Sequence, residues 1–305
     1  MNIILWIQSP QSPYISRAIN VLAQQYGNLN FIGTVYSDTL TPPPAPGGIT
    51  LNGKVLPVIN KTELSSIDYD LIIVIGQNAS LVPILKEAEE LKINPDKVIL
   101  DRTICVPSFT LERYKKLRKS KLSIFAKNCW GGNIYHRFGL QFLTPTINMF
   151  TSDEGFLRFL KNPQQDMKEE LILEKMQINP DLNINYPVFS ISNTSWYMNH
   201  YPNVEIAKQK WQERKKKINW FNLLVMMYTD DSATLKEFDK LPYAKKVCFV
   251  PFKTELDSGF YIEPEIVRGR AFWQPVNETS SGLMNYDLWD LLLYGKKTPL
   301  QIKNN

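Results

Sequence analysis

Segments typical of β-strands and α-helices alternate along the first hundred residues, and this alternation restricts the fold more than any other feature of the chain. Short apolar runs typical of buried strands lie at residues 2–7, 31–36, 71–75 and 97–100, and stretches typical of helices lie at residues 14–25 and 81–91. The run at 71–75 is entirely aliphatic, as expected for a central parallel strand. This alternation predicts an α/β fold with an N-terminal Rossmann-like, doubly wound sheet.

The turn after the first predicted strand, residues 8–13, has the sequence Gln-Ser-Pro-Gln-Ser-Pro and contains no glycine. The three glycines of a dinucleotide-binding turn are therefore missing, and neither a nicotinamide nor a flavin nor any other cofactor is predicted. Ser12 followed by Pro13 predicts the capped start of a helix, whose first backbone N–H groups can hold an anion. A sugar nucleotide or another phosphate-bearing ligand is compatible with such a turn.

The rest of the chain predicts a second α/β domain. Residues 1–110 form the predicted Rossmann-like domain, residues 111–120 a basic connector helix, and residues 121–305 the second domain. Its predicted strands lie at residues 123–126, 221–228, 245–251 and 260–267, and a C-terminal helix is predicted at residues 288–293. Residues 151–154, Thr-Ser-Asp-Glu, have the pattern of a capping box that starts a further helix. The order of the strands in the second domain is left open.

Charge and cysteine content argue against several classes of protein. The 305 residues include 35 basic and 30 acidic side chains, and this small excess does not predict a nucleic-acid partner. The three cysteines form no CxxC pair and the two histidines form no HxH or HExxH pattern, so neither a disulfide framework nor a metal site is predicted. With no run of about 18 apolar residues and no signal-peptide pattern, we expect a cytoplasmic protein without a membrane span.

The ten-residue stretch KNCWGGNIYH, which begins at Lys127, combines a thiol, a tryptophan, two glycines and a histidine. Cys129 is a candidate catalytic nucleophile, because a thiol near a base or a positive charge can ionise. The two glycines permit a tight turn whose amides bind a phosphate or an oxyanion. Alternatively the stretch is structural, because free cysteines are usually buried and a tryptophan ring can pack over glycine backbone. The candidate substrate-binding residues here are Asn128, Trp130, Gly131, Gly132 and His136.

A second cluster begins at His200, a candidate catalytic residue, and Tyr201, a candidate substrate contact. Asn203 is the predicted N-cap of a helix. One face of that helix, at spacings of three and four, carries Val204, Ala207, Trp211, Arg214 and Ile218. Arg214 therefore points inward, where its charge needs a carboxylate, a carbonyl or an anionic ligand. A salt bridge packed on the core and the binding of a ligand phosphate or carboxylate both remain open.

Asp230 and Asp231 follow the predicted strand at residues 221–228, at its carboxyl end. Ligands and catalytic carboxylates gather at that end of strands in open α/β sheets, so Asp230 is a third candidate catalytic residue. The alternative is that Asp231 or Ser232 caps the following helix, predicted at residues 233–240, which is the commoner role for such residues.

The stretch from residue 123 to residue 150 resembles a bacterial family of uncharacterised proteins labelled exopolysaccharide or capsule biosynthesis proteins. The family pattern joins Asn-Cys-Trp-Gly-Gly, here residues 128–132, to Gly-Leu-x-Phe-x-[Ser/Thr]-Pro, here 139–145, and Asn-Met/Leu-Phe, here 148–150. The resemblance extends over residues 111–294 through the His200-Tyr201 pair with its following helix and through Leu-Pro-Tyr at 241–243. It implies a role in making or decorating cell-surface glycans and implies no catalytic residue. Residues 191–195 depart from it, because they lack an acidic residue that would partner His200.

We therefore expect a transferase-like enzyme, glycosyl or acyl, that acts on an activated sugar or glycan precursor. The glycine turn, His200 and Arg214 are expected to form its pocket, and covalent acyl transfer through Cys129 is a sharper version of the same hypothesis. The alternative is a non-catalytic protein of a polysaccharide pathway that holds a sugar phosphate or a partner enzyme. A homodimer is compatible with both hypotheses.

Overall fold

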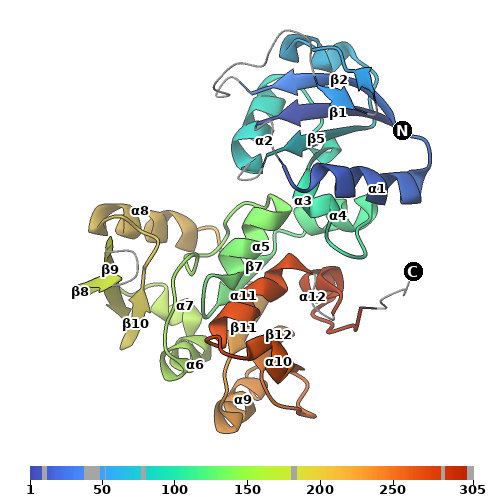
Figure 1. The fold of residues 1–305 in the computed structure, drawn as a ribbon. Coiled ribbons are helices and arrows are strands. Elements are labelled where there is room, and N and C mark those ends of the chain that lie inside the picture. The colour runs from blue at the N-terminus through green and yellow to red at the C-terminus, as the bar shows by residue number, and fades with distance from the viewer. Residues whose placement is uncertain are drawn as a thin grey trace. The chain divides into compact units, whose positions relative to one another are not determined.

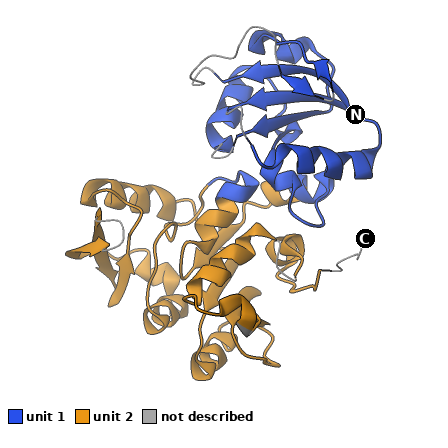
Figure 2. Ribbon diagram, in the orientation of Figure 1, with its two compact units in different colours: residues 1–115, 136–141 blue, residues 116–135, 142–305 orange. Residues whose placement is uncertain are grey.

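A computed structural model of the chain describes residues 1–8, 12–37, 49–51, 53–76, 80–179, 184–282 and 286–300. The chain forms two compact units, one of residues 1–115 and 136–141 and the other of residues 116–135 and 142–305 (Figure 2). Both units are mixed α/β structures built on a parallel sheet. The chain passes from the first unit to the second within α4 (Leu111–Lys119), the predicted connector helix.

Unit 1 contains a four-stranded parallel sheet whose strand order is β2-β1-β5-β6. The strands are β1 (Asn2–Ile7), β2 (Asn30–Tyr36), β5 (Leu71–Ile75) and β6 (Val98–Leu100). The central strands β1 and β5 are almost wholly apolar and buried, as their aliphatic runs predicted. The helices of this unit are α1 (Ile15–Tyr26), α2 (Leu81–Glu90) and α3 (Asp101–Ile104), with 3-10 turns η1 (Lys61–Ser66) and η2 (Pro95–Lys97) and a hairpin of β3 (Thr50–Leu51) and β4 (Lys54–Val55).

The predicted cap of the first helix is wrong in detail. Helix α1 begins at Ile15 after Tyr14, which makes no side-chain cap, so Ser12 is not the capping residue. The Ser12 hydroxyl instead accepts from the backbone N–H of Tyr14 at 3.2 Å and donates to the Asp101 carboxylate at 2.5 Å. Asp101 is fully buried at the end of β6, so this hydrogen bond satisfies part of an otherwise costly buried carboxylate.

Unit 2 contains a second four-stranded parallel sheet, in the order β13-β12-β11-β7 (Figure 1). Its strands are β7 (Ser123–Ala126), β11 (Leu223–Tyr228), β12 (Lys245–Val250) and β13 (Gly259–Tyr261). Its longer helices are α5 (Trp130–Phe138), whose last residues belong to unit 1, α6 (Asp153–Lys161), α8 (Val204–Lys215), α9 (Ser232–Asp239) and α12 (Leu288–Tyr294). Shorter helices are α7 (Pro163–Asp166), α10 (Pro264–Val267), α11 (Trp273–Glu278) and the 3-10 turn η3 (Thr279–Ser281).

A three-stranded antiparallel sheet in unit 2 was not predicted. It consists of β8 (Ile172–Asn179), β9 (Ile184–Ile191) and β10 (Thr194–Tyr197), in the order β10-β9-β8. The rings of Phe159 and Trp211 pack against Trp196 of β10, with ring centroids 5.3 and 6.2 Å apart. One core cluster therefore joins this sheet to α6, α8 and the parallel strands β7 and β11.

Three further predictions need correction. The strand predicted from residue 221 starts at Leu223, and Phe221 before it is fully exposed. The strand predicted over residues 260–267 ends at Tyr261, because Pro264 starts helix α10. Ser152, rather than the preceding threonine, caps α6 by accepting from the backbone N–H of Gly155 at 3.1 Å. Within the described residues, no helix has both the length and the apolar character that a membrane crossing requires.

Candidate functional site

The motif stretch and the Asp230 segment lie at the same edge of the parallel sheet in unit 2. Strands β7 and β11 are parallel neighbours, so the residues that follow them emerge side by side. We call the carboxyl-edge cluster the set formed by Lys127, Asn128, Cys129, Asp153 and Thr229. This edge is where open α/β sheets usually bind ligands.

A buried ion pair organises the cluster. The Lys127 ammonium donates to one carboxylate oxygen of Asp153 and to the carbonyl of Tyr228 at 2.9 Å, and it lies 3.8 Å from the centroid of the Tyr228 ring. The Thr229 hydroxyl donates to the other carboxylate oxygen of Asp153 at 2.6 Å. The Lys127 side chain is 7% exposed and that of Asp153 is 32% exposed, so the carboxylate reaches solvent and the ammonium does not.

Sequence reasoning missed this ion pair. Lys127 was the first residue of the motif and Asp153 was part of the predicted helix start, but nothing in the sequence indicated that they meet. A usable signal existed, because a lysine directly after a fully buried strand must place its charge near the sheet edge.

Asn128 presents an unsatisfied donor at the start of α5. Asn128 is 4% exposed, and its Oδ1 accepts from the backbone N–H of Trp130 at 3.1 Å. Its Nδ2 is buried and has no hydrogen-bond partner among the described residues. The N–H groups of Gly131 and Gly132, in the first turn of α5, have no acceptor within the helix. Buried donors are normally paired, so this end of the helix is suited to an acceptor from a ligand or water.

The two glycines also have a packing role. A Cβ on Gly131 would lie 3.1 Å from the Cβ of Ala126, and a Cβ on Gly132 would overlap the side-chain amide oxygen of Asn148. Helix α5 therefore approaches β7 and Asn148 more closely than a larger residue would allow. Trp130 is completely buried and its Nε1 donates to the Thr279 hydroxyl at 2.8 Å, so its ring belongs to the core of unit 2.

Cys129 is partly exposed, and burial raises the pKa of its thiol to about 11. The thiol is therefore protonated at neutral pH. Burial raises the pKa of Tyr228 to about 12, with smaller contributions from Asp153, Cys129 and Asp230, so the thiol and Asp230 both lie within electrostatic reach of this phenol.

Arg214 points inward as predicted, and it binds a hydroxyl. Its Nη1 donates to the Tyr201 hydroxyl at 2.6 Å, and its guanidinium lies 4.9 Å from the ring centroid of Phe142. The Tyr201 hydroxyl in turn donates to the carbonyl of Ile147 at 2.8 Å. Burial raises the pKa of Tyr201, Arg214 lowers it, and Cys129 raises it, so the tyrosine lies near both groups. No carboxylate pairs with Arg214 in the part of the chain that the structure describes.

Neither histidine makes a hydrogen bond to the Cys129 thiol among the described residues. His136 is exposed, seven residues beyond Cys129 in a continuous helix, which corresponds to about 10 Å along the axis. Partial burial and then the positive charges of Arg102 and Arg137, both in unit 1, lower the pKa of His136. His200 is exposed, partial burial lowers its pKa, and no hydrogen bond joins it to Cys129 among the described residues.

The two aspartates after β11 have different roles. The Asp231 carboxylate accepts from the backbone N–H groups of Ala233 and Thr234 at 3.3 and 2.8 Å and caps α9, so the capping interpretation is confirmed for this residue. These hydrogen bonds lower its pKa. Asp230 is exposed at the end of the strand. No group of three or more His, Cys, Asp or Glu side chains placed to hold a metal occurs in the described ranges.

Of the predicted site residues, the structure therefore brings together Asn128, the two glycines and Cys129, with Tyr201 and Arg214 on one side. Asp230 lies at the same sheet edge. The Trp130 ring packs in the core of unit 2, and the side chains of His136 and His200 make no hydrogen bond to these residues within the described ranges.

Comparison with known proteins identifies relatives for the larger part of the chain. A family model described as "Domain of unknown function (DUF1919)" matches residues 101–288, which include the whole carboxyl-edge cluster. An "Uncharacterized protein" of Haemophilus influenzae is 30% identical over 159 residues, which cover 50% of this chain and 73% of that relative.

Proposed function

The chain belongs to the family described as a domain of unknown function (DUF1919), and we propose that it is a transferase-like enzyme of cell-surface polysaccharide biosynthesis. It acts in the cytoplasm on an activated sugar or glycan precursor bound at the carboxyl-edge cluster. The observation that carries the proposal is the buried Nδ2 of Asn128, which has no hydrogen-bond partner among the described residues. It lies at the start of α5, where the N–H groups of Gly131 and Gly132 have no acceptor within the helix. Buried donors at a helix N-terminus favour an anionic oxygen, as in a sugar phosphate or sugar nucleotide.

The charges around the cluster support the same ligand class. Arg214 has no carboxylate partner among the described residues, and a guanidinium binds phosphate well through paired hydrogen bonds. The likeness to exopolysaccharide and capsule biosynthesis proteins supports a sugar as the group that carries the phosphate.

We propose that the reaction is a direct transfer without a covalent enzyme intermediate. A thiol with a pKa of about 11 is protonated at neutral pH, and no histidine of the described residues hydrogen-bonds to it. Cys129 then contacts the substrate as a neutral group. Asp230, exposed at the end of β11, is the candidate base that takes the proton of the acceptor hydroxyl. The acceptor oxygen forms a bond to the transferred sugar while the bond between that sugar and the donor phosphate breaks, and the phosphate leaves with the electron pair of the broken bond.

We also propose that the sheet of unit 1 is Rossmann-like and doubly wound. The strand order supports this proposal. The order β2-β1-β5-β6 corresponds to the first four strands of the doubly wound order 2-1-3-4-5.

A second candidate function is non-catalytic binding of a sugar phosphate. Neither histidine hydrogen-bonds to Cys129 among the described residues, and this favours the second candidate, because a binding protein needs the donors of the cluster but no acid or base. Product analysis separates the two functions. Chromatographic detection of transfer from a bound donor to an acceptor supports the enzyme, and binding without conversion supports the second candidate.

The test compares two asparagines of the same segment. Thermal shift and calorimetric titration would use UDP-glucose, glucose 1-phosphate and acetyl-CoA as probes. Asn128→Asp keeps the oxygen that caps α5 but replaces the donor with a negative charge, whereas Asn133→Asp changes an exposed residue of the same helix. Because a hydrogen bond to a charged group contributes about 1.5–3 kcal/mol, we expect Asn128→Asp to weaken binding by about 10- to 100-fold.

The Asn133→Asp variant is expected to bind like the unmodified protein. The proposal fails if no probe of the panel shifts the melting temperature, or if Asn128→Asp binds as tightly as Asn133→Asp.

A further inference from the structure

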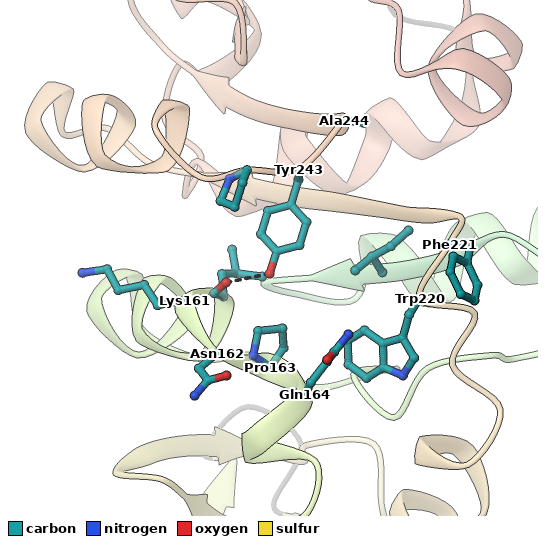
Figure 3. Close-up of a pocket in the computed structure, with 11 residues that line it drawn as sticks. Lys161, Asn162, Pro163, Gln164, Trp220, Phe221, Tyr243 and Ala244 are labelled. Carbon is teal, nitrogen blue, oxygen red and sulfur yellow. Dashed lines mark hydrogen bonds between the residues drawn. The ribbon is translucent and has the colours of Figure 1, made fainter.

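A second candidate binding site lies at the opposite edge of the same sheet. A cavity of about 430 Å³ opens at the amino ends of β11 and β12, and we call it the amino-edge cavity (Figure 3). The side chains that matter for its chemistry are Lys161, Asn162, Gln164, Trp220, Phe221 and Tyr243. Its volume falls in the range of small-molecule sites.

Aromatic rings form one part of the lining. Trp220 packs edge-on against Phe125 of the core, with ring centroids 5.8 Å apart. The Tyr243 hydroxyl donates to the carbonyl of Leu160 at 2.6 Å, as the dashed line in Figure 3 shows. These two rings are therefore held in place without a ligand. Phe221, by contrast, is fully exposed and loses no packing energy when a ligand covers it.

Polar side chains form the other part. Lys161, Asn162 and Gln164 come from the end of α6 and the start of α7, and all three are exposed. The side-chain amides of Asn162 and Gln164 make no hydrogen bond within the described residues, so four N–H donors and two carbonyl oxygens are open to a ligand. No carboxylate lines the cavity in the part of the chain that the structure describes.

We propose that the amino-edge cavity is a carbohydrate-binding subsite for one or two neutral sugar residues of a glycan. A pyranose has apolar C–H faces that pack on aromatic rings, and hydroxyls at its rim that both donate to and accept from amides. A lipid chain would leave the amides without partners. The single ammonium of Lys161, shared at 3.9 Å with Glu237, is too little charge to select an acidic peptide.

This subsite is distinct from the carboxyl-edge cluster. The six residues of β11 separate the two edges by about 20 Å. A glycan of several sugar residues is long enough to contact both edges, and only this acceptor role rests on the proposed transferase function. Binding of a sugar at the amino-edge cavity stands without it.

The test measures binding of neutral disaccharides. Saturation-transfer NMR and titration would use maltose, cellobiose and lactose with the full chain. We expect Phe221→Ala and Gln164→Ala each to weaken binding by about 2- to 10-fold, the loss of one ring or one amide contact. Both residues are exposed, so both variants should melt like the unmodified protein. Gln212→Ala, an exposed glutamine of α8 outside the cavity, is the matched control and should bind normally.

Several results would contradict the proposal of a carbohydrate-binding subsite. They are absence of binding by all three disaccharides, binding that the two variants leave unchanged, and binding of a proline-rich peptide in place of a sugar. A dimer in sedimentation that Phe221→Ala converts to a monomer, without sugar binding, would assign the cavity to self-association. Asn128→Asp should retain disaccharide binding, which separates failure of this subsite from failure of the proposed function.

Discussion

Cys129 is subject to two opposing effects, because it directly precedes α5 and is also largely removed from water. A helix N-terminus lowers the pKa of a thiol, whereas burial raises it. Here burial dominates, and the pKa rises to about 11. The residue most suggestive of covalent catalysis in the sequence is therefore a neutral group at neutral pH.

Alkylation of Cys129 tests this directly. At pH 7 we expect iodoacetamide to modify Cys129 at least about 100-fold more slowly than a free thiol, because a pKa about two units higher lowers the thiolate fraction by that factor. The rate should rise through pH 10. Peptide mass spectrometry assigns the modified cysteine, with glutathione as the reference thiol. Modification at pH 7 as fast as glutathione would restore Cys129 as a candidate nucleophile.

The Lys127–Asp153 pair should contribute more to the free energy of unfolding than an exposed ion pair does. Lys127→Met leaves a partly buried carboxylate without its cation, and we expect the free energy of unfolding to fall by about 3 kcal/mol. Lys210→Met removes the exposed pair with Glu213 and should cost less than about 1 kcal/mol. Urea denaturation measures both.

A double variant completes that comparison. Lys127→Met with Asp153→Asn should cost at least about 1 kcal/mol less than the sum of the single variants, because the carboxylate charge is then absent. Additive costs would mean that the two side chains stabilise the fold independently.

Among the elements, the packing of α5 on β7 depends on glycines that a helix would ordinarily disfavour. Glycine in a helix costs about 1 kcal/mol relative to alanine, so Gly132→Ala would normally stabilise the protein. Here the added Cβ would overlap the amide oxygen of Asn148. The tertiary contact therefore reverses the local preference.

We expect Gly132→Ala to destabilise the protein by about 1–3 kcal/mol, the usual cost of overpacking. Removing the Asn148 side chain should restore the preference of the helix for alanine over glycine. Asn148 has a φ of 57°, which glycine adopts freely, so Asn148→Gly is a suitable background. In that background Gly132→Ala should be neutral or stabilising in thermal melts. An equal cost in both backgrounds would show that Asn148 is not the obstacle.

The strands also differ in how well the sequence predicted them. β5 is apolar throughout, and β1 and β7 are apolar after their first residues, Asn2 and Ser123. Their bounds agree with the prediction because a strand covered on both faces is mostly apolar. The sequence did not predict β8. Most of its residues are exposed, and it mixes isoleucine, lysine, glutamate and glutamine without a buried face. Its pairing with β9 comes from backbone hydrogen bonds, which leave no periodic signal in the side chains.

At the scale of the whole molecule, buried thiols and a buried tyrosine hydroxyl make the free energy of unfolding depend on pH in the alkaline range. Burial raises the pKa of Cys105 and of Cys129 to about 11 from the ordinary value of 9.0, and it also raises the pKa of Cys248 and of Tyr135. The unfolded chain therefore releases these protons at lower pH than the folded protein does. The stability is fully present below pH 9 and is lost as pH rises from about 9 toward 11.

We expect the free energy of unfolding to fall by up to about 1.4 kcal/mol per thiol between pH 8 and pH 10. Urea titrations at pH 8, 9 and 10 measure the change. A Cys105→Ala/Cys129→Ala variant should show a smaller decrease over that range. If the variant loses stability as steeply as the unmodified protein, these thiols are not the source of the pH dependence.

By itself the sequence determined the α/β class, the buried parallel strands and the inward direction of Arg214, and it offered capping as one of two roles for Asp231. Each follows from local spacing, because apolar periodicity and capping act within a few residues. Only the tertiary structure decided which side chains meet. Lys127 binds Asp153 across 26 residues, and Arg214 binds Tyr201 rather than a carboxylate. The Cys129 thiol is protonated and makes no hydrogen bond to either histidine among the described residues, because distances and burial depend on how strands and helices pack.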